Sequence, residues 1–358
     1  MGGIFLRTTL TGFLLLAIMP LEATLYEDAE DGNTQGNVPP NVRGWFVYDN
    51  TPAGAQILNV YDAIKQSRVI QFAGTNDTQN GYMLGNWYPT LAGNWNNTSE
   101  FNVHWCSRYS KNFVVFMRVY TTKLIQFVYN GVNFNTNQRY LYYVPGTGAP
   151  YWSSHKSYIR HRLGEHATNG LWQSFNRDLQ ADLHVFEPDN NITSVVAFLI
   201  RGSGKVDDIH LTATPMMPKL SLKKTAQTLF DPVNGQTNPK SIPGAIVEYT
   251  LRSENTGFQL VDNNSTVIQD NIPANMKVCV ADTGQCKKPF LVSSSNTSGL
   301  TLGNVAYKIN GNFVTNPPAD AGGFHSGVSA IKVTMNGKFL DKCSGSPAFE
   351  VRFRTGIK

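Results

Sequence analysis

The stretch Asn112–Thr121 reads NFVVFMRVYT and carries the pattern that decides the fold. Successive side chains of a β-strand point to opposite faces. One face of this strand is wholly apolar, with Phe113, Val115, Met117 and Val119. The other face is mixed, with Val114, Phe116, Arg118 and Tyr120. The alternation predicts a strand in a sheet that buries one side and presents Arg118 and Tyr120 on a working side.

Runs of the same kind recur along the chain between turn signals, and long helical stretches are absent from the pattern. Upstream they are Ala55–Tyr61, Ser67–Ala73, Phe101–Tyr109, Leu124–Tyr129, Arg139–Val144, Leu171–Asp178 and Ser194–Arg201. Downstream they are Ala245–Ser253, Ser265–Asp270, Lys277–Ala281, Asn304–Ile309, Ala330–Met335 and Ala348–Thr355. Only Leu179–Phe186 favours a helical turn. Many short strands with little helix predict an all-β chain of β-sandwiches.

The sharpest break in composition is Ala213–Lys219 (ATPMMPK). Because prolines resist incorporation into central strands, this segment is the natural linker. We therefore expect a first β-domain over residues 25–214, a linker over 215–218, and a second β-domain over 219–358.

The N-terminus indicates export. One positive charge in Met1–Arg7 precedes the apolar run Phe13–Met19, and a small-residue site follows near Ala23. This layout predicts a signal peptide over residues 1–23, too short to span a membrane. We expect a secreted protein, extracellular or held at a cell surface, with no membrane span. With a net charge of +5 and only 15% charged residues, the chain lacks the Lys/Arg concentration of a nucleic-acid-binding protein.

Four cysteines are present. Cys279 and Cys286 enclose VADTGQ, in which Asp282–Gly284 predicts a turn. A turn there would bring the two cysteines opposite each other, and export permits their oxidation, so we expect this disulfide. Cys106 and Cys343 fall in different predicted domains, and we expect both to be free buried thiols.

Two acidic fragments bracket the first domain. It opens with Leu25–Gly32 (LYEDAEDG), followed by Gly44-Trp45, and it closes with Gly202–Ile209 (GSGKVDDI). This pairing resembles the jelly-roll carbohydrate-binding modules of secreted bacterial polysaccharide-active proteins. The resemblance covers about half of the chain and implies a jelly-roll β-sandwich.

The same resemblance implies a structural calcium ion. In a jelly roll the first and last strands lie near each other, so the two acidic fragments could converge. Clustered carboxylates repel one another unless a hard cation such as Ca²⁺ neutralises them. The expected ligands are Glu27, Glu30 and Asp208, with Asp28 and Asp207 as alternates; solvated acidic strand ends are the other interpretation.

The second domain carries its own signature. Ile242–Gly257 (IPGAIVEYTLRSENTG) is followed by Val267–Pro273 (VIQDNIP). This run resembles the immunoglobulin-like conserved-repeat domain of bacterial surface and secreted proteins, over about Pro218–Lys358. The resemblance implies an immunoglobulin-like β-sandwich that acts as a spacer without chemistry of its own.

Arginine and aromatic side chains are the candidate ligand-binding groups of the first domain. The predicted set is Arg108, Arg118, Tyr120, Tyr142, Trp152, Arg160 and Arg201. Tyr140 shares a strand face with Tyr142. If these strands are neighbours, a groove results whose planar guanidinium groups suit carboxylates and sulfates, which favours an acidic polysaccharide. Structural ion pairs are the alternative explanation for the arginines.

The sequence contains few residue patterns that are typical of a catalytic site. The sequence has no G-x-S-x-G or H-E-x-x-H motif, and its cysteines lack zinc spacing. Tyr158, Arg160 and His161 are the residue types of a polysaccharide lyase, which is an alternative hypothesis. The leading hypothesis is a non-catalytic protein that binds an extracellular polysaccharide or cell-surface glycan, with calcium as a structural ion. The rival is a structural or adhesive surface protein that self-associates, for which pairing through the C-terminal strand is one route.

Overall fold

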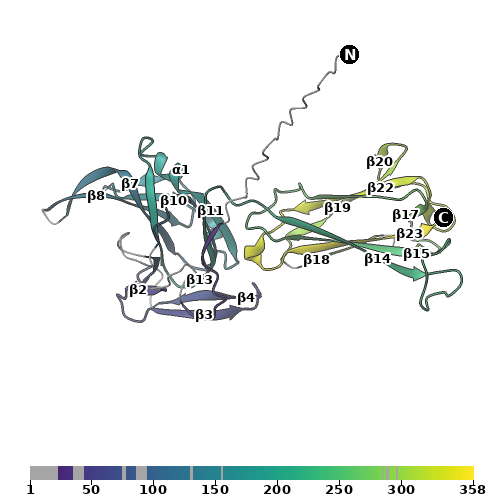
Figure 1. The fold of residues 1–358 in the computed structure, drawn as a ribbon, viewed down its shortest axis with the longest axis horizontal. Coiled ribbons are helices and arrows are strands. Elements are labelled where there is room, and N and C mark those ends of the chain that lie inside the picture. The colour runs from purple at the N-terminus through teal and green to yellow at the C-terminus, as the bar shows by residue number, and fades with distance from the viewer. Residues whose placement is uncertain are drawn as a thin grey trace, which may run out of the picture.

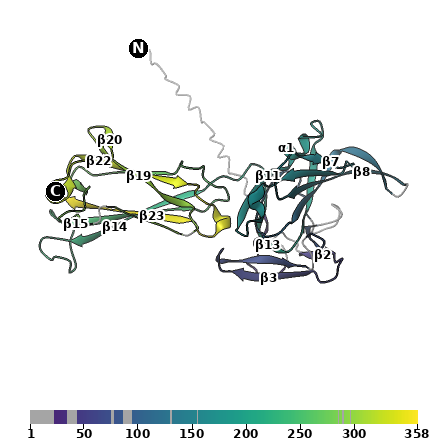
Figure 2. The ribbon, with the colours of Figure 1, turned by 180° about the vertical axis from the view of Figure 1, so that it is seen from behind.

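A computed structural model describes residues 23–34, 44–74, 78–85, 95–129, 132–154, 156–284, 286–287, 290–295 and 297–358. The predicted signal peptide lies almost entirely outside the described residues. Within them, no helix has both the length and the apolar character needed to cross a bilayer. The chain forms two β-sandwiches that lie side by side, with the C-terminus at the end of the second sandwich remote from the first (Figure 1, Figure 2). The all-β prediction is confirmed.

One sheet of the first sandwich, sheet A, is six-stranded. Its strands in spatial order are β11 (Gln173–Asp178), β6 (Asn102–Arg108), β13 (Gly204–Thr212), β4 (Ser67–Ala73) and β3 (Gln56–Asp62), and β1 (Thr24–Glu27) also pairs with β13. First and last strands therefore do lie side by side, as the jelly-roll expectation required.

The other sheet, sheet B, is seven-stranded. Its order is β2 (Phe46–Asp49), β5 (Gly81–Gly85), β12 (Ile192–Arg201), β7 (Val114–Tyr129), β8 (Val132–Val144), β10 (Tyr158–Arg162) and β9 (Tyr151–Trp152). The chain passes repeatedly between the sheets, from β4 to β5, β6 and β7, and later from β11 to β12 and β13, which gives the jelly-roll form. The short helix α1 (Leu179–His184) and the 3-10 helix η1 (Glu165–Thr168) lie between strands.

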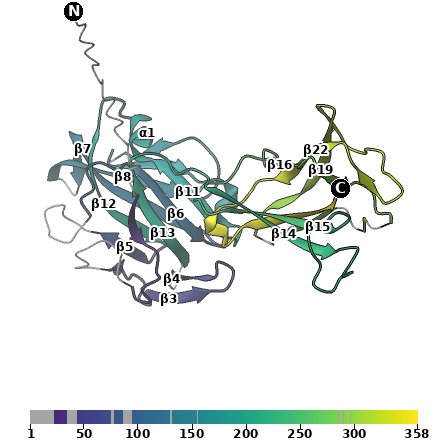
Figure 3. The ribbon, with the colours of Figure 1, turned by 45° about the vertical axis from the view of Figure 1, so that its right-hand side comes forward.

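The apolar strand faces meet between the two sheets. The core includes Trp105, Phe198 and Tyr82, and the buried face predicted for NFVVFMRVYT contributes Val115, Met117 and Val119. The stacked layers are visible in Figure 3, where β12, β7 and β8 lie beside β6 and β13. Each sheet therefore has one buried inner face and one outer face, and the two outer faces are described separately below.

The second sandwich also has two sheets. One contains β14 (Leu220–Phe230), β15 (Ile246–Asn255), β23 (Ala348–Ile357), β17 (Met276–Cys279), β21 (Phe324–His325) and β18 (Phe290–Ser294). The other contains β16 (Val267–Asn271), β22 (Val328–Gly337), β19 (Leu300–Ile309) and β20 (Asn312–Val314). The C-terminal strand β23 pairs with β15 on one side and with β17 and β18 on the other. Both edges of β23 are therefore paired within the chain, so the strand pairing considered under the self-association hypothesis would have to displace one of these partners.

Both pairs of cysteines form disulfides. Cys279 pairs with Cys286, as expected. Cys106 pairs with Cys343, so the expectation of free thiols was wrong. Cys106 lies on β6, and Cys343 lies in the 3-10 helix η2 (Lys342–Ser344). The domain assignment separated the two cysteines by sequence, but the fold brings their Cα atoms to 5.3 Å across the junction of the sandwiches.

The second sandwich covers part of the outer face of sheet A. Val69, Cys106 and Trp172 of the first sandwich pack with Cys343 and Phe258 of the second. Hydrogen bonds add to this contact, from Ser174 Oγ to the Phe258 carbonyl (2.9 Å) and from Asn176 Nδ2 to Gln259 Oε1 (2.7 Å). Among the described residues, these junction contacts come from sheet A and the segment next to it.

Candidate functional site: the outer face of sheet B

The outward side chains of β7, β8 and β10 form two rows across sheet B. In one row, Arg118 lies opposite Tyr140, and Tyr140 lies opposite Tyr158. In the next row, the register runs from Phe116 to Tyr142, then to Arg160 and to Tyr151 of β9. We call these seven residues, together with Tyr120, the open face. They are Phe116, Arg118, Tyr120, Tyr140, Tyr142, Tyr151, Tyr158 and Arg160.

The aromatic rings of the open face contact one another. Tyr140 and Tyr158 stack with centroids 4.8 Å apart and planes tilted by 11°, and Phe116 stacks with Tyr142 at 5.5 Å. Tyr158 also meets Phe116 and Tyr142 edge-on. Mutual packing holds the rings in place, and Tyr158 and Tyr151 remain 38% and 48% exposed. Ordered, accessible rings of this kind give a flat apolar ligand a surface to lie on.

The guanidinium groups lie over the rings. The Cζ atom of Arg118 is 5.9 Å from the Tyr140 ring centroid, and that of Arg160 is 5.0 Å from the Tyr151 centroid. Arg118 is buried, with 3% exposure. Across the described ranges, Arg160 makes no ion pair, and its buried Nε has no hydrogen-bond acceptor. Arg160 thus brings a positive charge and an unused donor to an aromatic surface, an arrangement suited to a carboxylate or sulfate.

Three tyrosines of the open face, Tyr140, Tyr142 and Tyr158, have raised pKa values. Burial raises the pKa of Tyr140 to about 12, against a smaller lowering effect of Arg118. Burial also raises the pKa values of Tyr142 and Tyr158. At neutral pH these phenols are therefore neutral and can both donate and accept hydrogen bonds.

The outer face of sheet B brings together five of the seven predicted ligand-binding residues. Arg118, Tyr120, Tyr142 and Arg160 belong to the open face, and the Tyr120 hydroxyl accepts a hydrogen bond from Gln138 Nε2 (2.7 Å). Arg201 lies on the same sheet but is engaged by its neighbours. Its Nε donates to the Tyr48 hydroxyl (3.0 Å), and its second terminal nitrogen pairs with Asp49 (2.7 Å).

The other two predicted residues lie elsewhere. Trp152 pairs with Ile159 in register, so its ring turns toward the core, contacts Phe186 and donates to the Lys156 carbonyl (2.7 Å). Arg108 belongs to β6 of sheet A, where it donates to Asp62 (3.3 Å) and to the Gly170 carbonyl (2.8 Å). The prediction placed Arg108 with the rest because the sequence does not reveal which strands share a sheet.

The sequence reasoning omitted Phe116 and Tyr151 from the predicted set and gave Tyr158 a catalytic role only. The signal for Phe116 was available, because Phe116 alternates with Arg118 on the same strand face. For Tyr151 no local signal exists. Its strand has only two residues, so the side of the sheet on which Tyr151 lies is set by the pairing of β9 with β10.

The fold does not assemble the residues of the lyase hypothesis. On β10, Tyr158 and Arg160 point outward, whereas Ile159 and His161 point inward. His161 Nδ1 lies 3.6 Å from Asp182, and burial lowers the pKa of His161. Tyr158 and His161 therefore lie on opposite sides of the sheet and cannot act on one substrate atom.

The carboxylates expected to hold calcium are each engaged by groups of the chain. Glu27 accepts hydrogen bonds from the Ala29 amide (2.7 Å) and from Trp45 Nε1 (2.7 Å), and burial raises its pKa to about 8. Glu30 contacts the Ser67 hydroxyl and the Arg68 amide. Asp207 and Asp208 are both bound by Lys65. These residues do not fit a calcium ion, because Asp207 and Asp208 enclose the Lys65 ammonium group, and Glu27 and Glu30 accept hydrogen bonds from other groups of the chain.

One grouping of three possible metal ligands occurs in the described part of the chain, namely His104, Cys106 and Cys343. The two sulfur atoms are joined to each other in the disulfide. The grouping therefore offers no thiolate to a metal.

The chain matches no protein-family model and no curated protein. Among solved structures it is similar to the tandem CBM22-1–CBM22-2 domains of Paenibacillus barcinonensis Xyn10C, with 10% identity, a TM-score of 0.23, and coverage of 95% of this chain and 99% of that chain. An exo-β-agarase gives 13% identity and a TM-score of 0.23, over 53% of this chain and 25% of that chain. The endo-1,4-β-glucanase CelB2 gives 8% identity and a TM-score of 0.24, over 48% and 91% of the two chains. At these scores the similarities carry no argument about function.

Proposed function

We propose that this protein binds an extracellular polysaccharide through the open face of sheet B, without catalysing a reaction on it. The observation that carries the proposal is the paired rows of rings and guanidinium groups on β7, β8, β10 and β9. Sugar rings present C–H faces that lie flat on aromatic rings, and their hydroxyl groups pair with neutral phenols.

The proposed ligand is an acidic polysaccharide. Arg160, with no ion pair in the described ranges, and Arg118, stacked on Tyr140, are the cations of the face. A uronate carboxylate or a sulfate ester would supply an anionic partner to Arg160, whose buried Nε has no hydrogen-bond acceptor among the described residues. Charge-assisted hydrogen bonds of this type are about twice as strong as neutral ones.

In this proposal the second sandwich carries and orients the first. It contacts sheet A through Cys343 and Phe258. The open face, on the other sheet, is left accessible to a long polymer. A secreted, non-catalytic binding protein with an immunoglobulin-like spacer is the function that this arrangement favours.

The test uses the full chain, because the junction buries side chains of both sandwiches. Affinity electrophoresis would compare its migration in gels with and without uronate, sulfated and neutral polysaccharides. Retardation by at least one acidic polymer supports the proposal. Unchanged migration in every polymer, with no binding on a glycan array, would overturn it. Release of unsaturated products from a uronate polymer would show that the protein is catalytic.

A further inference from the structure

The two aspartates that close the first domain lie side by side in an irregular part of β13. The pairing with β6 shifts register between Asp207 and His210, and Asp208 adopts a left-handed backbone conformation with a φ of 49°. In a regular strand, neighbouring side chains would point to opposite faces. The bulge instead turns both carboxylates toward one point, where they would repel each other without a cation.

A lysine from the β3–β4 turn reaches that point. The Nζ atom of Lys65 contacts Asp207 Oδ2 and lies 2.6 Å from Asp208 Oδ2. All three side chains are buried, and Lys65 is 5% exposed. A buried ammonium group of this kind is stable only when it is paired.

The turn that carries Lys65 is built to direct it inward. Asp62 Oδ1 accepts hydrogen bonds from the amides of Ile64 (3.0 Å) and Lys65 (3.1 Å), which fixes the turn. Trp172 donates to the same oxygen (3.2 Å), and the Lys65 ammonium lies 5.0 Å from the Trp172 ring centroid. Asp62 thus fixes the backbone of Lys65, while the Trp172 ring and the two aspartates surround its ammonium group.

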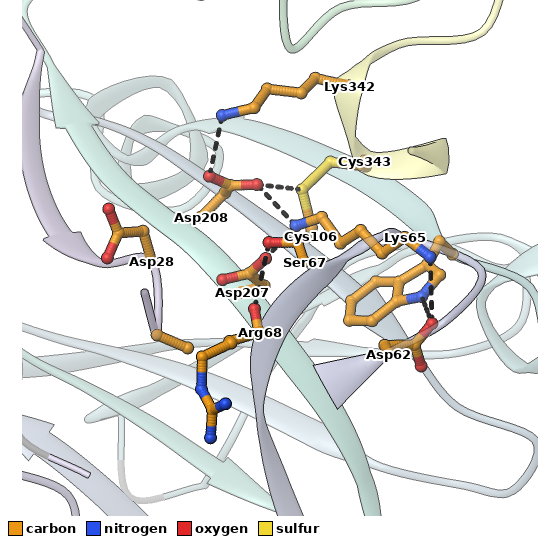
Figure 4. Close-up of polar contacts among 12 residues, drawn as sticks. Asp28, Asp62, Lys65, Ser67, Arg68, Cys106, Asp207, Asp208, Lys342 and Cys343 are labelled. Carbon is orange, nitrogen blue, oxygen red and sulfur yellow. Dashed lines mark hydrogen bonds and ion pairs between the residues drawn. A yellow bond between two sulfur atoms is a disulfide. The ribbon is translucent and has the colours of Figure 1, made fainter. Parts of the chain in front are cut away.

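The second sandwich closes the cluster from above. Lys342 lies 3.6 Å from Asp208 Oδ1 (Figure 4). The Cys106–Cys343 disulfide is adjacent, with Cys106 Sγ 3.7 Å from Asp208 Oδ2. A Cβ atom on Gly345 would meet the Ile64 carbonyl at 2.9 Å, so η2 and the residues after it pack tightly on the lysine turn. Asp208 therefore has positive charges from both sandwiches.

We infer that Lys65 is a resident cation that takes the place of the expected calcium ion, so that the first sandwich is stable without a bound metal. Calcium requires six to eight oxygen ligands in direct contact. Here Asp207 and Asp208, two of the carboxylates expected to bind calcium, enclose an ammonium group, and a divalent ion could bind them both only by displacing it. Lys65, a residue of the same chain, supplies the positive charge that neutralises Asp207 and Asp208.

The first arm of the test measures the melting temperature of the full wild-type chain in excess EDTA, in buffer alone and in millimolar calcium chloride. Metal independence predicts the same melting temperature in all three, because no ligand binds the folded state. A rise of several degrees in calcium that EDTA reverses, or calcium binding in a calorimetric titration, would overturn the inference.

The second arm removes the ammonium group. Lys65→Met leaves two buried aspartates without their partner, and we expect the melting temperature to fall by roughly 10 °C. The matched control is Lys223→Met on the exposed strand β14, which should change it by less than about 2 °C. If Lys65→Met is as stable as the control, Lys65 is not the neutralising group.

A third variant covers the case in which Lys65→Met does not fold. Lys65→Met/Asp207→Asn/Asp208→Asn removes all three charges and keeps the side-chain sizes. Because no buried uncompensated charge remains and Lys342 is half exposed to solvent, this variant should fold and melt above Lys65→Met. A triple variant that is no better than the single one would contradict the charge-pairing account.

Discussion

The outer face of sheet A and the outer face of sheet B both place cations beside aromatic rings, but in different surroundings. On sheet A, Arg108 and Lys205 share Asp62, and Lys65 is enclosed by Asp207 and Asp208. The second sandwich covers part of this face. On sheet B, Arg160 has no ion pair among the described residues and lies on a partly exposed tyrosine.

The difference separates structural charges from charges available to a ligand. Where an arginine or lysine is matched by a carboxylate of its own chain, removing it exposes an unpaired acid and costs stability. Where an arginine or lysine contacts only an aromatic ring, its charge is still available to bind an anionic ligand. The two faces therefore differ in whether an aspartate of the chain is paired with the cation.

The largest expected effect concerns the covered face. The Cys106–Cys343 disulfide closes a sequence separation of 237 residues, whereas Cys279–Cys286 closes 7. Chain entropy then predicts a loss of about 5 kcal/mol for Cys106→Ala/Cys343→Ala and about 2 kcal/mol for Cys279→Ala/Cys286→Ala. Scanning calorimetry should also show the two sandwiches melting separately in the first variant only. Equal losses in the two variants would mean that the junction does not depend on the covalent link.

The next effect concerns the rings of the open face. Tyr158→Ala should weaken binding to the preferred polysaccharide by roughly 30-fold, about 2 kcal/mol, because an exposed ring at the centre of the face is lost. The matched control is Tyr61→Ala on β3 of sheet A, where the tyrosine is 61% exposed. Isothermal titration calorimetry should find the control within about twofold of wild type. If Tyr61→Ala weakens binding as much as Tyr158→Ala, the two faces are not distinguished by function.

A smaller and more selective effect is expected for the arginines. Arg160→Gln should lower the affinity for an acidic polymer by roughly tenfold, because one charge-assisted hydrogen bond is worth about 1.5 kcal/mol. Affinity for the same polymer with its carboxyl groups reduced to alcohols should change little. Arg108→Gln on sheet A serves as the control and should leave both affinities unchanged. An Arg160→Gln variant that loses both polymers equally would assign Arg160 to packing and not to charge recognition.

The smallest expected effect is that of pH on binding. Burial raises the pKa of Tyr140 to about 12 and raises those of Tyr142 and Tyr158, so folding keeps these phenols protonated beyond their ordinary range. Arginines stay charged over the same range. Affinity should therefore be constant between about pH 6 and pH 9. A profile with an inflection near neutrality would require a different titrating group in the site.

The raised pKa of Tyr140 also makes the stability of the first sandwich depend on pH. A tyrosine whose pKa is raised from 10.0 to about 12 binds its proton more tightly in the folded state. Its contribution is present below the ordinary tyrosine pKa and is lost as the pH rises through that window. The stability of the first sandwich should fall between those two pH values, which ultraviolet titration of the tyrosines alongside thermal melts would detect.

Alternation predicted the two sides of β7, because the two-residue repeat is a property of any strand and does not depend on its neighbours. The sequence thus assigned Arg118 and Tyr120 to one side of β7 and Val115 and Met117 to the other, and the structure agrees. What alternation leaves open is which strands share a sheet. Arg108 was misplaced for that reason, and Trp152 was misplaced because its face depends on the register of β9 with β10.

The covered face was harder to predict because it depends on long-range contacts. Pairing of Cys106 with Cys343 joins two domains whose separation in sequence argued against it. The acidic pair of β13 was recognised, but the bulge at Asp208 and the approach of Lys65 over 143 positions leave no local signature. The two adjacent aspartates indicated that a cation was needed to neutralise them, but not that Lys65 of the same chain would be that cation.

The most direct test of the central claim is hydroxyl-radical footprinting of the full chain with and without a saturating acidic polysaccharide, read by mass spectrometry. Tyr151 and Tyr158 on sheet B and Tyr61 on sheet A are all exposed enough to be oxidised in the free protein. Binding through the open face predicts protection of Tyr151 and Tyr158 and unchanged oxidation of Tyr61. Protection of Tyr61 alone, or of none of the three under conditions where the polymer is bound, would contradict the account.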